Sequence, residues 1–395
     1  MRRRVFVTGL GIISAIGNGT EETLDSFRLL ASGIGRLSLF RSNHAEIPVA
    51  EVKYSNEKLI EIAKADNKVL CTRNTSMALI AATQAMLSSG WGHDSHLRSG
   101  VIMATTVGGM DFNEEYYLSL LQDDTHKNVI PVLDSADCTE KVAAVAGIRH
   151  HVSTISTACS SSANAIMLGT RLIQNDRLDR LLVGGTDSLT RFTLNGFLAL
   201  EILSPTGCRP FDRNRNGLTI GEGAAVLVLE SERVANPERI ICEVTGYANA
   251  NEAFHATASS ADGFGALLAM KGALASASMD PSEISYVNAH GTGTEINDLS
   301  EGRAIEQLFG TGIPPVSSTK AFTGHTLGAA GAIEAVFSAL ALKHQTLLPG
   351  LNFSVPMEEL HFQPVLQPAT AVINHVMSNS FGFGGNNTSL IFSKT

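Results

Sequence analysis

Hydrophobic and polar positions follow two patterns along this chain, and each pattern predicts one kind of element. Short apolar runs that end in Gly/Thr-rich turns, such as "VFVTGLG" at 5–11 and "VIMATTVGG" at 101–109, are typical of buried strands. Longer segments with helical spacing of apolar residues, such as "TSMALIAATQAMLSSG" at 75–90 and "GALLAMKGALASASM" at 265–279, predict helices between them. Alternation of the two patterns predicts an α/β protein with parallel sheets covered by helices.

The strand motifs recur in the same order in the second part of the chain. The first set continues with "TISTACSSSANA" (154–165) and "LLVGGTDS" (181–188). The second set is "CEVTGYAN" (242–249), "YVNAHGTGT" (286–294), "VSSTKAFTGHTLGAAGA" (316–332) and "HVMSNSFGFGG" (375–385). This repeat predicts a duplicated fold with halves 1–236 and 237–395, although similarity this faint is equally compatible with coincidence.

Composition and charge narrow the functional classes. The 395 residues are 44% hydrophobic and 17% charged, as expected for a well-buried protein. A net charge of −9 argues against binding of nucleic acid or anionic lipid. The apolar segment Ala321–Leu342 contains His325 and Glu334, which favours a buried helix over a membrane span. Five scattered cysteines without metal-ligand spacing predict reduced thiols, a cytoplasmic protein and no metal site.

Cys159 lies where a Ser/Thr-rich strand passes into a helix that begins with very small residues. Free N–H groups and the helix dipole would favour a thiolate at this position, and the Cys159 N–H could face an oxyanion. The pattern therefore fits a nucleophile. A small buried side chain, which is the usual role of a lone cysteine, remains the alternative.

Two histidines lie in separate glycine-rich loops. His290 ends an apolar strand, and the loop "HGTGT" that it opens would let a substrate pass close to the backbone. His325 follows Gly324 near the start of a Gly/Ala-rich helix, which favours a neutral imidazole. Lys320 and Glu334 lie in apolar surroundings and would compensate each other's charge. The alternatives are a histidine satisfied inside a turn and a structural ion pair beside a core histidine.

The loop "NSFGFGG" at 379–385 offers Phe383, whose N–H could be a second oxyanion donor, although a turn with core aromatics is the simpler interpretation. One cysteine and two histidines on separate loops are a suitable set for forming an acyl thioester and stabilising a carbanion equivalent.

The whole chain closely resembles the elongating β-ketoacyl-acyl-carrier-protein synthases of the thiolase superfamily. The resemblance rests on six motifs in order, "VTGLGIISAIGNG", "TACSSS", "RPFDRNRNGLTIGEGAA", "AHGTGTEIND", "STKAFTGHTLGAAGA" and "NSFGFGGNNTS". It implies a duplicated thiolase-like α/β fold of five layers, αβαβα, with two mixed sheets. His150–His151 and "GGNN" depart from the usual pattern of the family, and "TACSSS" and "HGTGT" lean toward its polyketide-type members.

The activity implied by the resemblance is an acyltransferase reaction, the decarboxylative Claisen condensation of fatty-acid or polyketide-like synthesis. Cys159 would carry the acyl chain, received from the phosphopantetheine of an acyl carrier protein. The N–H groups of Cys159 and Phe383 would form the oxyanion hole, and His290 and His325 would stabilise the enolate of the malonyl group. Lys320 and Glu334 would set the electrostatics around His325. No cofactor beyond the carried phosphopantetheine is implied, and Asp298 and Glu301 match supporting positions behind the loop of His290.

Further expectations concern the acyl chain and the partners. Val107, Met110 and Phe383 would line or gate the acyl pocket. The carrier would dock on basic residues, for which the candidates are Arg209, Arg213, Lys68, Arg73 and Lys127. The strand at 154–158 would lie near the twofold axis of a homodimer, or of a heterodimer with a second synthase subunit. The alternatives are a non-condensing chain-length partner subunit, which usually lacks the cysteine, and a CoA-dependent thiolase, which would bear a second catalytic cysteine.

Overall fold

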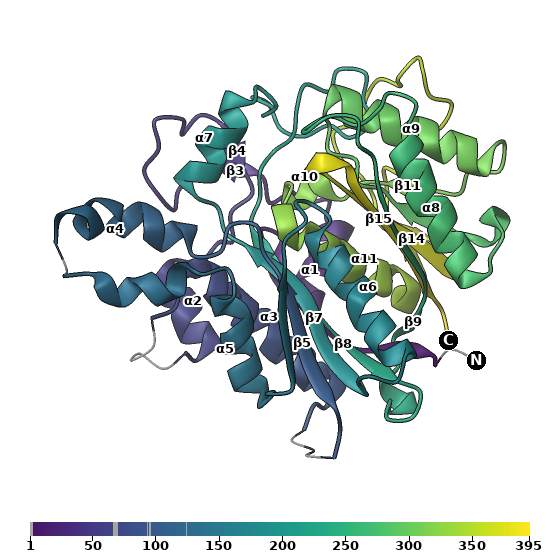
Figure 1. Ribbon diagram of the computed structural model, residues 1–395. Helices are drawn as coiled ribbons and strands as arrows, with labels where there is room; N and C mark the ends of the chain where they lie inside the picture. The colour runs from purple at the N-terminus through teal and green to yellow at the C-terminus, as the bar shows by residue number, and fades with distance from the viewer. Residues whose placement is uncertain (1–2, 66–69, 93, 95, 124) are drawn as a thin grey trace.

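An eleven-stranded mixed sheet runs through the protein (Figure 1). The computed structural model describes residues 3–65, 70–92, 94, 96–123 and 125–395. In these residues one hydrogen-bonded path connects β11 (Val316–Ser317), β10 (Tyr286–Asn288), β14 (His375–Gly382), β15 (Asn386–Ser393), β9 (Cys242–Asn251), β1 (Val5–Ser14), β8 (Gly223–Ser231), β7 (Arg180–Asp187), β5 (Ser99–Ala104) and β6 (His151–Ile155). The short β2 (Gly17–Asn18) pairs with β1.

The middle of this path is its weakest connection. β1 and β9 share only the pairs Phe6–Glu243 and Val7–Cys242, whereas β1 pairs with β8 over its full length. The two sheets implied by the sequence are thus present as two halves of one path, β6 to β1 and β9 to β11. Two small ribbons lie apart from it, β3 (Gly35–Arg36) with β4 (Pro48–Val49) and β12 (Thr346–Leu347) with β13 (Ala369–Thr370).

Helices cover both halves and also separate them. The inner pair, α6 (Ser161–Gln174) and α11 (Ala330–His344), packs between the two halves of the sheet (Figure 1). The outer layers are α3 (Arg73–Ser89) and α5 (Asp137–Ala146) on one side, and α8 (Phe264–Ala277) and α9 (Glu295–Phe309) on the other. The five-layer αβαβα prediction is confirmed.

Small residues explain how close the inner helices lie. A Cβ atom on Gly331 of α11 would lie only 2.7 Å from the backbone nitrogen of Ala163 on α6. The expected helix 321–342 is interrupted, since the short α10 (Lys320–Thr323) ends where Gly324 turns the backbone with a φ of 64°, and α11 begins only at Ala330. That turn creates the loop that holds His325.

The remaining helices lie around these five layers. They are α1 (Thr20–Arg28), α2 (Asn56–Ala63), α4 (Met110–Gln122), α7 (Arg191–Ala199) and the short α10 (Lys320–Thr323). α4 and the 3₁₀ helix η1 (Lys127–Leu133) extend away from the body of the molecule (Figure 1). In the described ranges no helix is both long enough and apolar enough to cross a bilayer.

Candidate active site

Cys159 sits on a sharp turn between β6 and α6. Ala158, directly before it, has a φ of 53°, in the left-handed region that costs an alanine roughly 1–2 kcal/mol. Ser161 supports this conformation, because its hydroxyl accepts from the N–H of Thr157 at 2.7 Å and donates to the carbonyl of Ala158 at 2.5 Å. The strained turn, held by a hydroxyl-rich helix start, directs the thiol out of the sheet and into a cavity.

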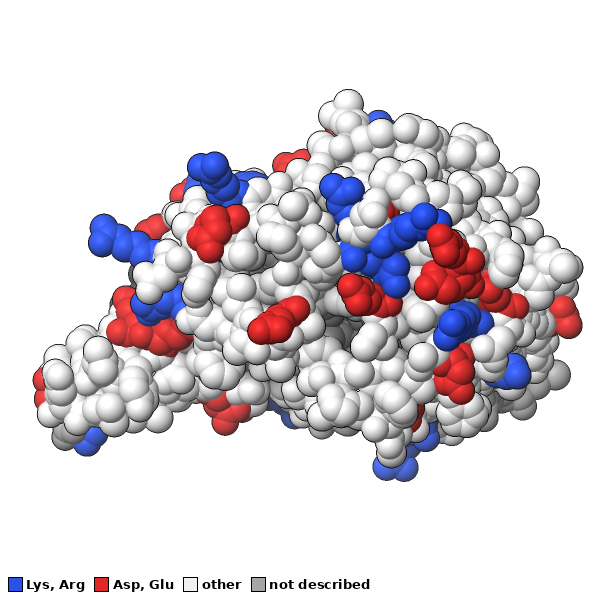
Figure 2. Space-filling view, turned by 90° about the horizontal axis from the view of Figure 1, so that it is seen from above, with Lys and Arg blue, Asp and Glu red and all other residues white. Residues whose placement is uncertain are grey.

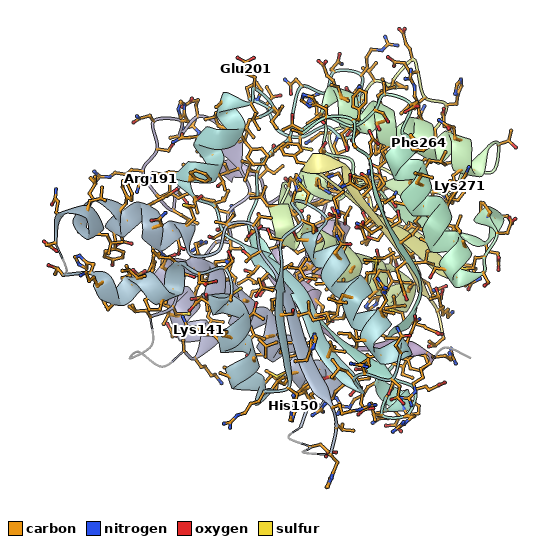
Figure 3. The ribbon with its side chains drawn as sticks, in the orientation of Figure 1. Lys141, His150, Arg191, Glu201, Phe264 and Lys271 are labelled. Carbon is orange, nitrogen blue, oxygen red and sulfur yellow. The ribbon has the colours of Figure 1, made fainter. Side chains whose placement is uncertain are left out.

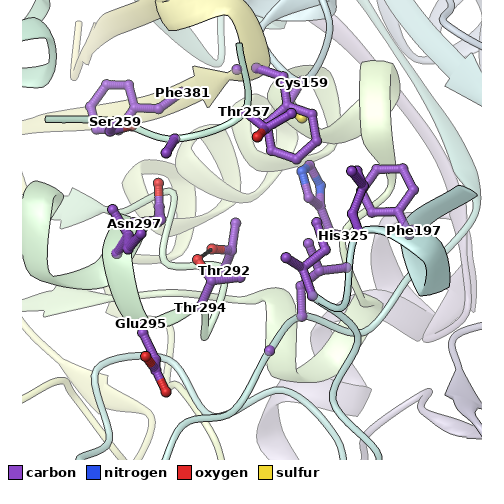
Figure 4. Close-up of a pocket in the computed structure, with 18 of the residues that line it drawn as sticks. Cys159, Phe197, Thr257, Ser259, Thr292, Thr294, Glu295, Asn297, His325 and Phe381 are labelled. Atoms are coloured by element: carbon purple, nitrogen blue, oxygen red, sulfur yellow. Dashed lines mark hydrogen bonds between the residues drawn. The ribbon is translucent and has the colours of Figure 1, made fainter. Parts of the chain in front are cut away.

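That cavity, of about 360 Å³, brings four of the predicted residues together. Cys159, His290, His325 and Phe383 all line it, although they come from four different segments of the chain. Figure 4 shows Cys159 and His325 at this cavity. The rings of His290 and His325 are 5.2 Å apart between centroids and nearly perpendicular. Phe383 lies half-buried against Phe197 of α7, with stacked rings 5.9 Å apart.

The loop of His290 is held by two buried carboxylates on α9. Glu301 accepts from the backbone N–H groups of His290 and Gly291, each at 2.8 Å. Asp298 accepts from the N–H of Gly293 at 3.1 Å and from that of Phe211 at 2.7 Å. Both carboxylates therefore act on the backbone of the loop, as expected for supporting positions. Burial raises the pKa of Glu301 to about 7.

Lys320 determines which ring nitrogen of His290 carries the hydrogen. Its Nζ lies 3.3 Å from His290 Nδ1 and also forms an ion pair with Glu334. An ammonium group only donates, so Nδ1 accepts and the imidazole carries its hydrogen on Nε2. Burial, reinforced by the charge of Lys320, moves the pKa of His290 well below its ordinary value. The ion pair is buried as expected, and burial raises the pKa of Glu334 to about 7.

His325 is the second neutral imidazole. Its backbone N–H donates to the carbonyl of Thr219 at 2.7 Å, and its carbonyl accepts from Gly221 at 3.0 Å. The pKa of His325 lies well below its ordinary value, mainly because the ring is buried and secondly because of the charge of Lys320. Lys320 was expected to act around His325. The structure places its direct contact on His290, and its influence on His325 is through charge alone.

The expectation of a resting thiolate is wrong. Burial raises the pKa of Cys159 to about 11, and the backbone N–H groups of Phe383 and Cys159 and the charge of Lys320 offset only part of that rise. The sequence pattern indicated the helix start but not how far the thiol lies from solvent. The resting nucleophile is consequently a thiol that must lose its proton during reaction. Because the backbone N–H groups of Phe383 and Cys159 lower the pKa of this thiol, both lie near the atom that would carry the acyl group.

Other cavity residues were not expected from the sequence. Hydroxyl and amide groups line the cavity at Asn216, Thr257, Ser259, Thr292, Thr294 and Asn297, and Figure 4 labels all of these except Asn216. The threonines of "HGTGT" could have been recognised as lining residues because they flank His290. No signal in the sequence distinguishes Phe197, which reaches the site from α7.

Two of the three residues expected at the acyl pocket lie outside this cavity, whereas the third, Phe383, lines it. Neither Val107 nor Met110 lines the described cavity. The backbone N–H of Val107 donates at 3.0 Å to Asp187, a buried carboxylate that also accepts from Gly328 at 2.7 Å. Asp187 thereby joins the loop after β5 to the loop after His325. An acyl pocket at Val107 and Met110 stays a prediction.

Arg73 corrects the docking prediction. Its side chain is buried, and its guanidinium makes a two-pronged ion pair with buried Glu222 at 2.8 and 2.5 Å and also donates to two backbone carbonyls. A group without access to solvent cannot receive a partner protein. Its role is internal, since loss of either partner would leave an uncompensated buried charge.

The other docking candidates have different surroundings. Arg213 and Lys127 are exposed, and Arg213 pairs with the exposed Glu358 at 2.8 Å. Arg209 is half-buried beside the loop of Gly293. Lys68 lies outside the described residues. The upper face of the molecule carries basic and acidic side chains in small mixed groups separated by uncharged surface (Figure 2).

Comparisons with known proteins agree with this geometry. Residues 2–235 match the family model "Beta-ketoacyl synthase, N-terminal domain", and residues 241–354 match "Beta-ketoacyl synthase, C-terminal domain". The chain is 33% identical over 410 residues to 3-oxoacyl-[acyl-carrier-protein] synthase 2 of Staphylococcus aureus (strain COL), covering 99% of this chain and 98% of that protein. It is 34% identical over 420 residues to the protein of that name from Rhizobium meliloti (strain 1021), covering 98% of each.

Solved structures give the same result. The ishigamide ketosynthase/chain length factor superposes with a TM-score of 0.91 at 30% identity, over 100% of both chains. The ketosynthase ApeO, solved in complex with its chain length factor ApeC from Xenorhabdus doucetiae, superposes with a TM-score of 0.83 at 33% identity, over 100% of this chain and 98% of that one.

Proposed function

Because this chain belongs to the β-ketoacyl synthase family, we propose that it is an acyltransferase that joins an acyl group to a malonyl group with loss of carbon dioxide. The observation that carries the proposal is the cavity itself. Cys159, the backbone of Phe383 and two neutral imidazoles line this one cavity. Both substrates would arrive as thioesters on the phosphopantetheine of an acyl carrier protein, and the product would be a 3-oxoacyl-carrier protein.

In the first step the Cys159 sulfur attacks the carbonyl of the acyl thioester. The new S–C bond forms, the bond to the carrier sulfur breaks, and the proton of Cys159 passes to the departing carrier sulfur, which leaves as a thiol. The N–H groups of Cys159 and Phe383 stabilise the oxyanion of the tetrahedral intermediate. Phe383, stacked on Phe197, would have to move aside for the acyl chain to pass.

In the second step the malonyl thioester replaces the emptied carrier. Its carbonyl oxygen accepts from Nε2–H of His290 and from His325, and the bond to the carboxylate breaks so that carbon dioxide leaves. The electron pair remains on the enolate, whose carbon attacks the acyl thioester on Cys159. The new C–C bond forms, the C–S bond breaks, and the thiolate left on Cys159 takes a proton from water. Lys320 keeps the hydrogen of His290 on Nε2 for this task.

The alternative of a non-condensing partner subunit is less well supported. Such a subunit usually lacks the cysteine, whereas here Cys159, His290 and His325 line one cavity. The chain-length-factor complexes among the similar structures make a heterodimer conceivable without favouring a silent role for this chain.

One experiment tests the activity directly. The purified protein is incubated with a panel of acyl-carrier proteins and with malonyl-carrier protein, and products are followed by mass spectrometry. We expect release of carbon dioxide and a 3-oxoacyl-carrier product two carbons longer than the acyl donor. Absence of both for every acyl group, with a folded protein and intact substrates, would overturn the proposal.

We propose that the carrier docks near the cavity mouth on Arg209, with Arg213 and Lys127 as additional contacts. Arg209→Glu should raise the KM for acyl-carrier protein and leave turnover of a small acyl-pantetheine unchanged. The difference should shrink with added salt, because exposed charges are screened over roughly 8 Å at physiological ionic strength. Equal slowing of both substrates, independent of salt, would identify Arg209 as a structural residue.

We also propose that the protein is a dimer, joined along the edge strand β6. This strand ends the sheet, its residues are only partly buried, and Val152 is exposed. An uncovered strand edge readily pairs with a second chain. Light scattering should give about twice the 41.8 kDa chain mass for a homodimer. A mass of one chain at micromolar concentration would contradict the proposal, and a heterodimer would require a second polypeptide in the complex purified from its own cells.

The division of the chain at 236/237 and the cytoplasmic location are likewise proposals. β8 ends at Ser231 and β9 begins at Cys242, and only the short 3₁₀ helix η2 (Pro237–Arg239) lies between them. The five cysteines are buried free thiols, which suits a reducing compartment. Proteolytic nicking at 232–241 that leaves the two halves associated would support the division, and recovery of the protein outside the cytoplasmic fraction would contradict the location.

A further inference from the structure

The mouth of the active-site cavity carries two acidic side chains and two apolar ones in a matched arrangement. Leu200 and Glu201 follow the end of α7 on one side, and Glu295 and Ile296 begin α9 on the other. All four line the cavity and all four are exposed, Leu200 by 46% and Ile296 by 50%. Glu295 lies at the end of the cavity opposite Cys159 (Figure 4), and Glu201 lies on the upper surface beyond α7 (Figure 3).

The charge of this mouth is not compensated within the cavity. Among the described lining residues there is no lysine or arginine, and the two histidines at the floor are neutral. Within the described part of the chain, neither Glu201 nor Glu295 has a side-chain hydrogen bond or ion pair. The guanidinium of Arg215 donates to the backbone carbonyls of Thr294 and Glu295 and not to either carboxylate. The channel therefore presents two carboxylates to whatever is attached to the outer end of the pantetheine arm.

From this geometry we infer that Glu201 and Glu295 determine which thioester donors the enzyme accepts, by repelling polyanionic free donors such as acyl-CoA. The inference rests on the proposed function. Pantetheine itself is uncharged and passes a mouth of hydroxyl, amide and apolar groups without penalty. Coenzyme A adds a diphosphate and a 3′-phosphate directly beyond the arm, where the two carboxylates lie. A carrier protein brings a single phosphodiester to this position, and its remaining contacts fall on the outer surface, where Arg209 and Arg213 are available.

The repulsion acts through water, so its size is limited and salt-dependent. At low ionic strength, one carboxylate several ångströms from one phosphate charge in water lowers the acylation rate by about fivefold. Added salt shortens the screening length to roughly 8 Å and so weakens this effect. Both carboxylates together should lower the use of acyl-CoA by an order of magnitude or more, about 10- to 25-fold.

The test compares two donors of one acyl group, acyl-CoA and acyl-pantetheine, by the rate at which each acylates Cys159, read as intact mass. In the double variant Glu201→Gln/Glu295→Gln we expect the rate from acyl-CoA to rise about 10- to 25-fold at low salt, with little change for acyl-pantetheine. Added salt should speed acyl-CoA in the native protein and not in the variant. Glu238→Gln, the same change at an exposed glutamate away from the cavity, is the control and should alter neither rate.

Three results are decisive. A rise for acyl-CoA confined to the double variant supports the inference. Acylation of Cys159 by both donors, with a ratio that neither the substitutions nor salt changes, overturns it and leaves the proposed function standing. Failure of both donors and of acyl-carrier protein to acylate Cys159 in the native enzyme overturns the proposed function together with the inference.

Discussion

Replacing Cys159 by alanine is expected to abolish condensation, by a factor on the order of 10⁴–10⁶, while leaving the fold intact. The substitution removes the only atom on which the acyl group would rest, at the point where two backbone N–H groups converge. It removes little volume, and the surrounding turn is held by Ser161 and by backbone bonds that alanine can keep. Activity with acyl- and malonyl-carrier protein, and thermal unfolding, give the two readouts.

The control is the same substitution at a buried cysteine outside the cavity. Cys138 lies on α5 and does not line the site, so Cys138→Ala should condense at a near-native rate. After incubation with acyl-carrier protein, the acyl adduct in the native enzyme should map to Cys159 by peptide mass spectrometry. An adduct on Cys71, Cys138, Cys208 or Cys242 with Cys159 free would show that the nucleophile has been misassigned.

The sequence was sufficient to predict the three central residues of the site. Cys159, His290 and His325 each lie where a strand or short helix meets a loop of very small residues, and such residues leave a recognisable local pattern. The alternation of strand and helix motifs predicts sheets covered by helices, whereas the five layers were implied by the family resemblance of the six motifs. These features are local in the chain or are repeated along it, so they can be read without knowing which segments touch.

The features that the sequence could not show depend on partners that are far away in the chain and on how deeply a side chain is buried. Arg73 resembles a surface cation at the start of a helix, but its partner Glu222 lies 149 residues away. The thiol of Cys159 was expected to ionise because the helix start is visible in the sequence, whereas its burial is a property of the assembled layers. Phe197 enters the site from α7, and Glu201 and Glu295 meet at its mouth, only because the fold brings these segments together.

Loss of either active-site histidine is expected to lower condensation by about 10²–10³, mainly at the decarboxylation of the malonyl group. Each imidazole would donate one hydrogen bond to the carbonyl oxygen that becomes negative as carbon dioxide leaves. His290→Ala and His325→Ala remove one donor each and leave the other in place. Acylation of Cys159 should persist in both variants, because the proton of Cys159 passes to the departing carrier sulfur and not to the carbonyl oxygen that the histidines would hold. His96→Ala, at an exposed histidine outside the cavity, is the matched control.

The pH dependence gives an independent test of the same roles. For both histidines, burial and the charge of Lys320 hold the pKa well below the ordinary value of 6.5. The neutral form is the working form, and it is fully present above the lowered pKa, so the titration of these imidazoles should not limit the rate between pH 6 and 8. Decarboxylation of malonyl-carrier protein by Cys159→Ala, which lacks the acylation step, isolates this property. An inflection near 6.5 that vanishes in His290→Ala or His325→Ala would show that a charged imidazole takes part. A His325→Ala enzyme that decarboxylates normally but cannot acylate Cys159 would assign that histidine to the first step instead.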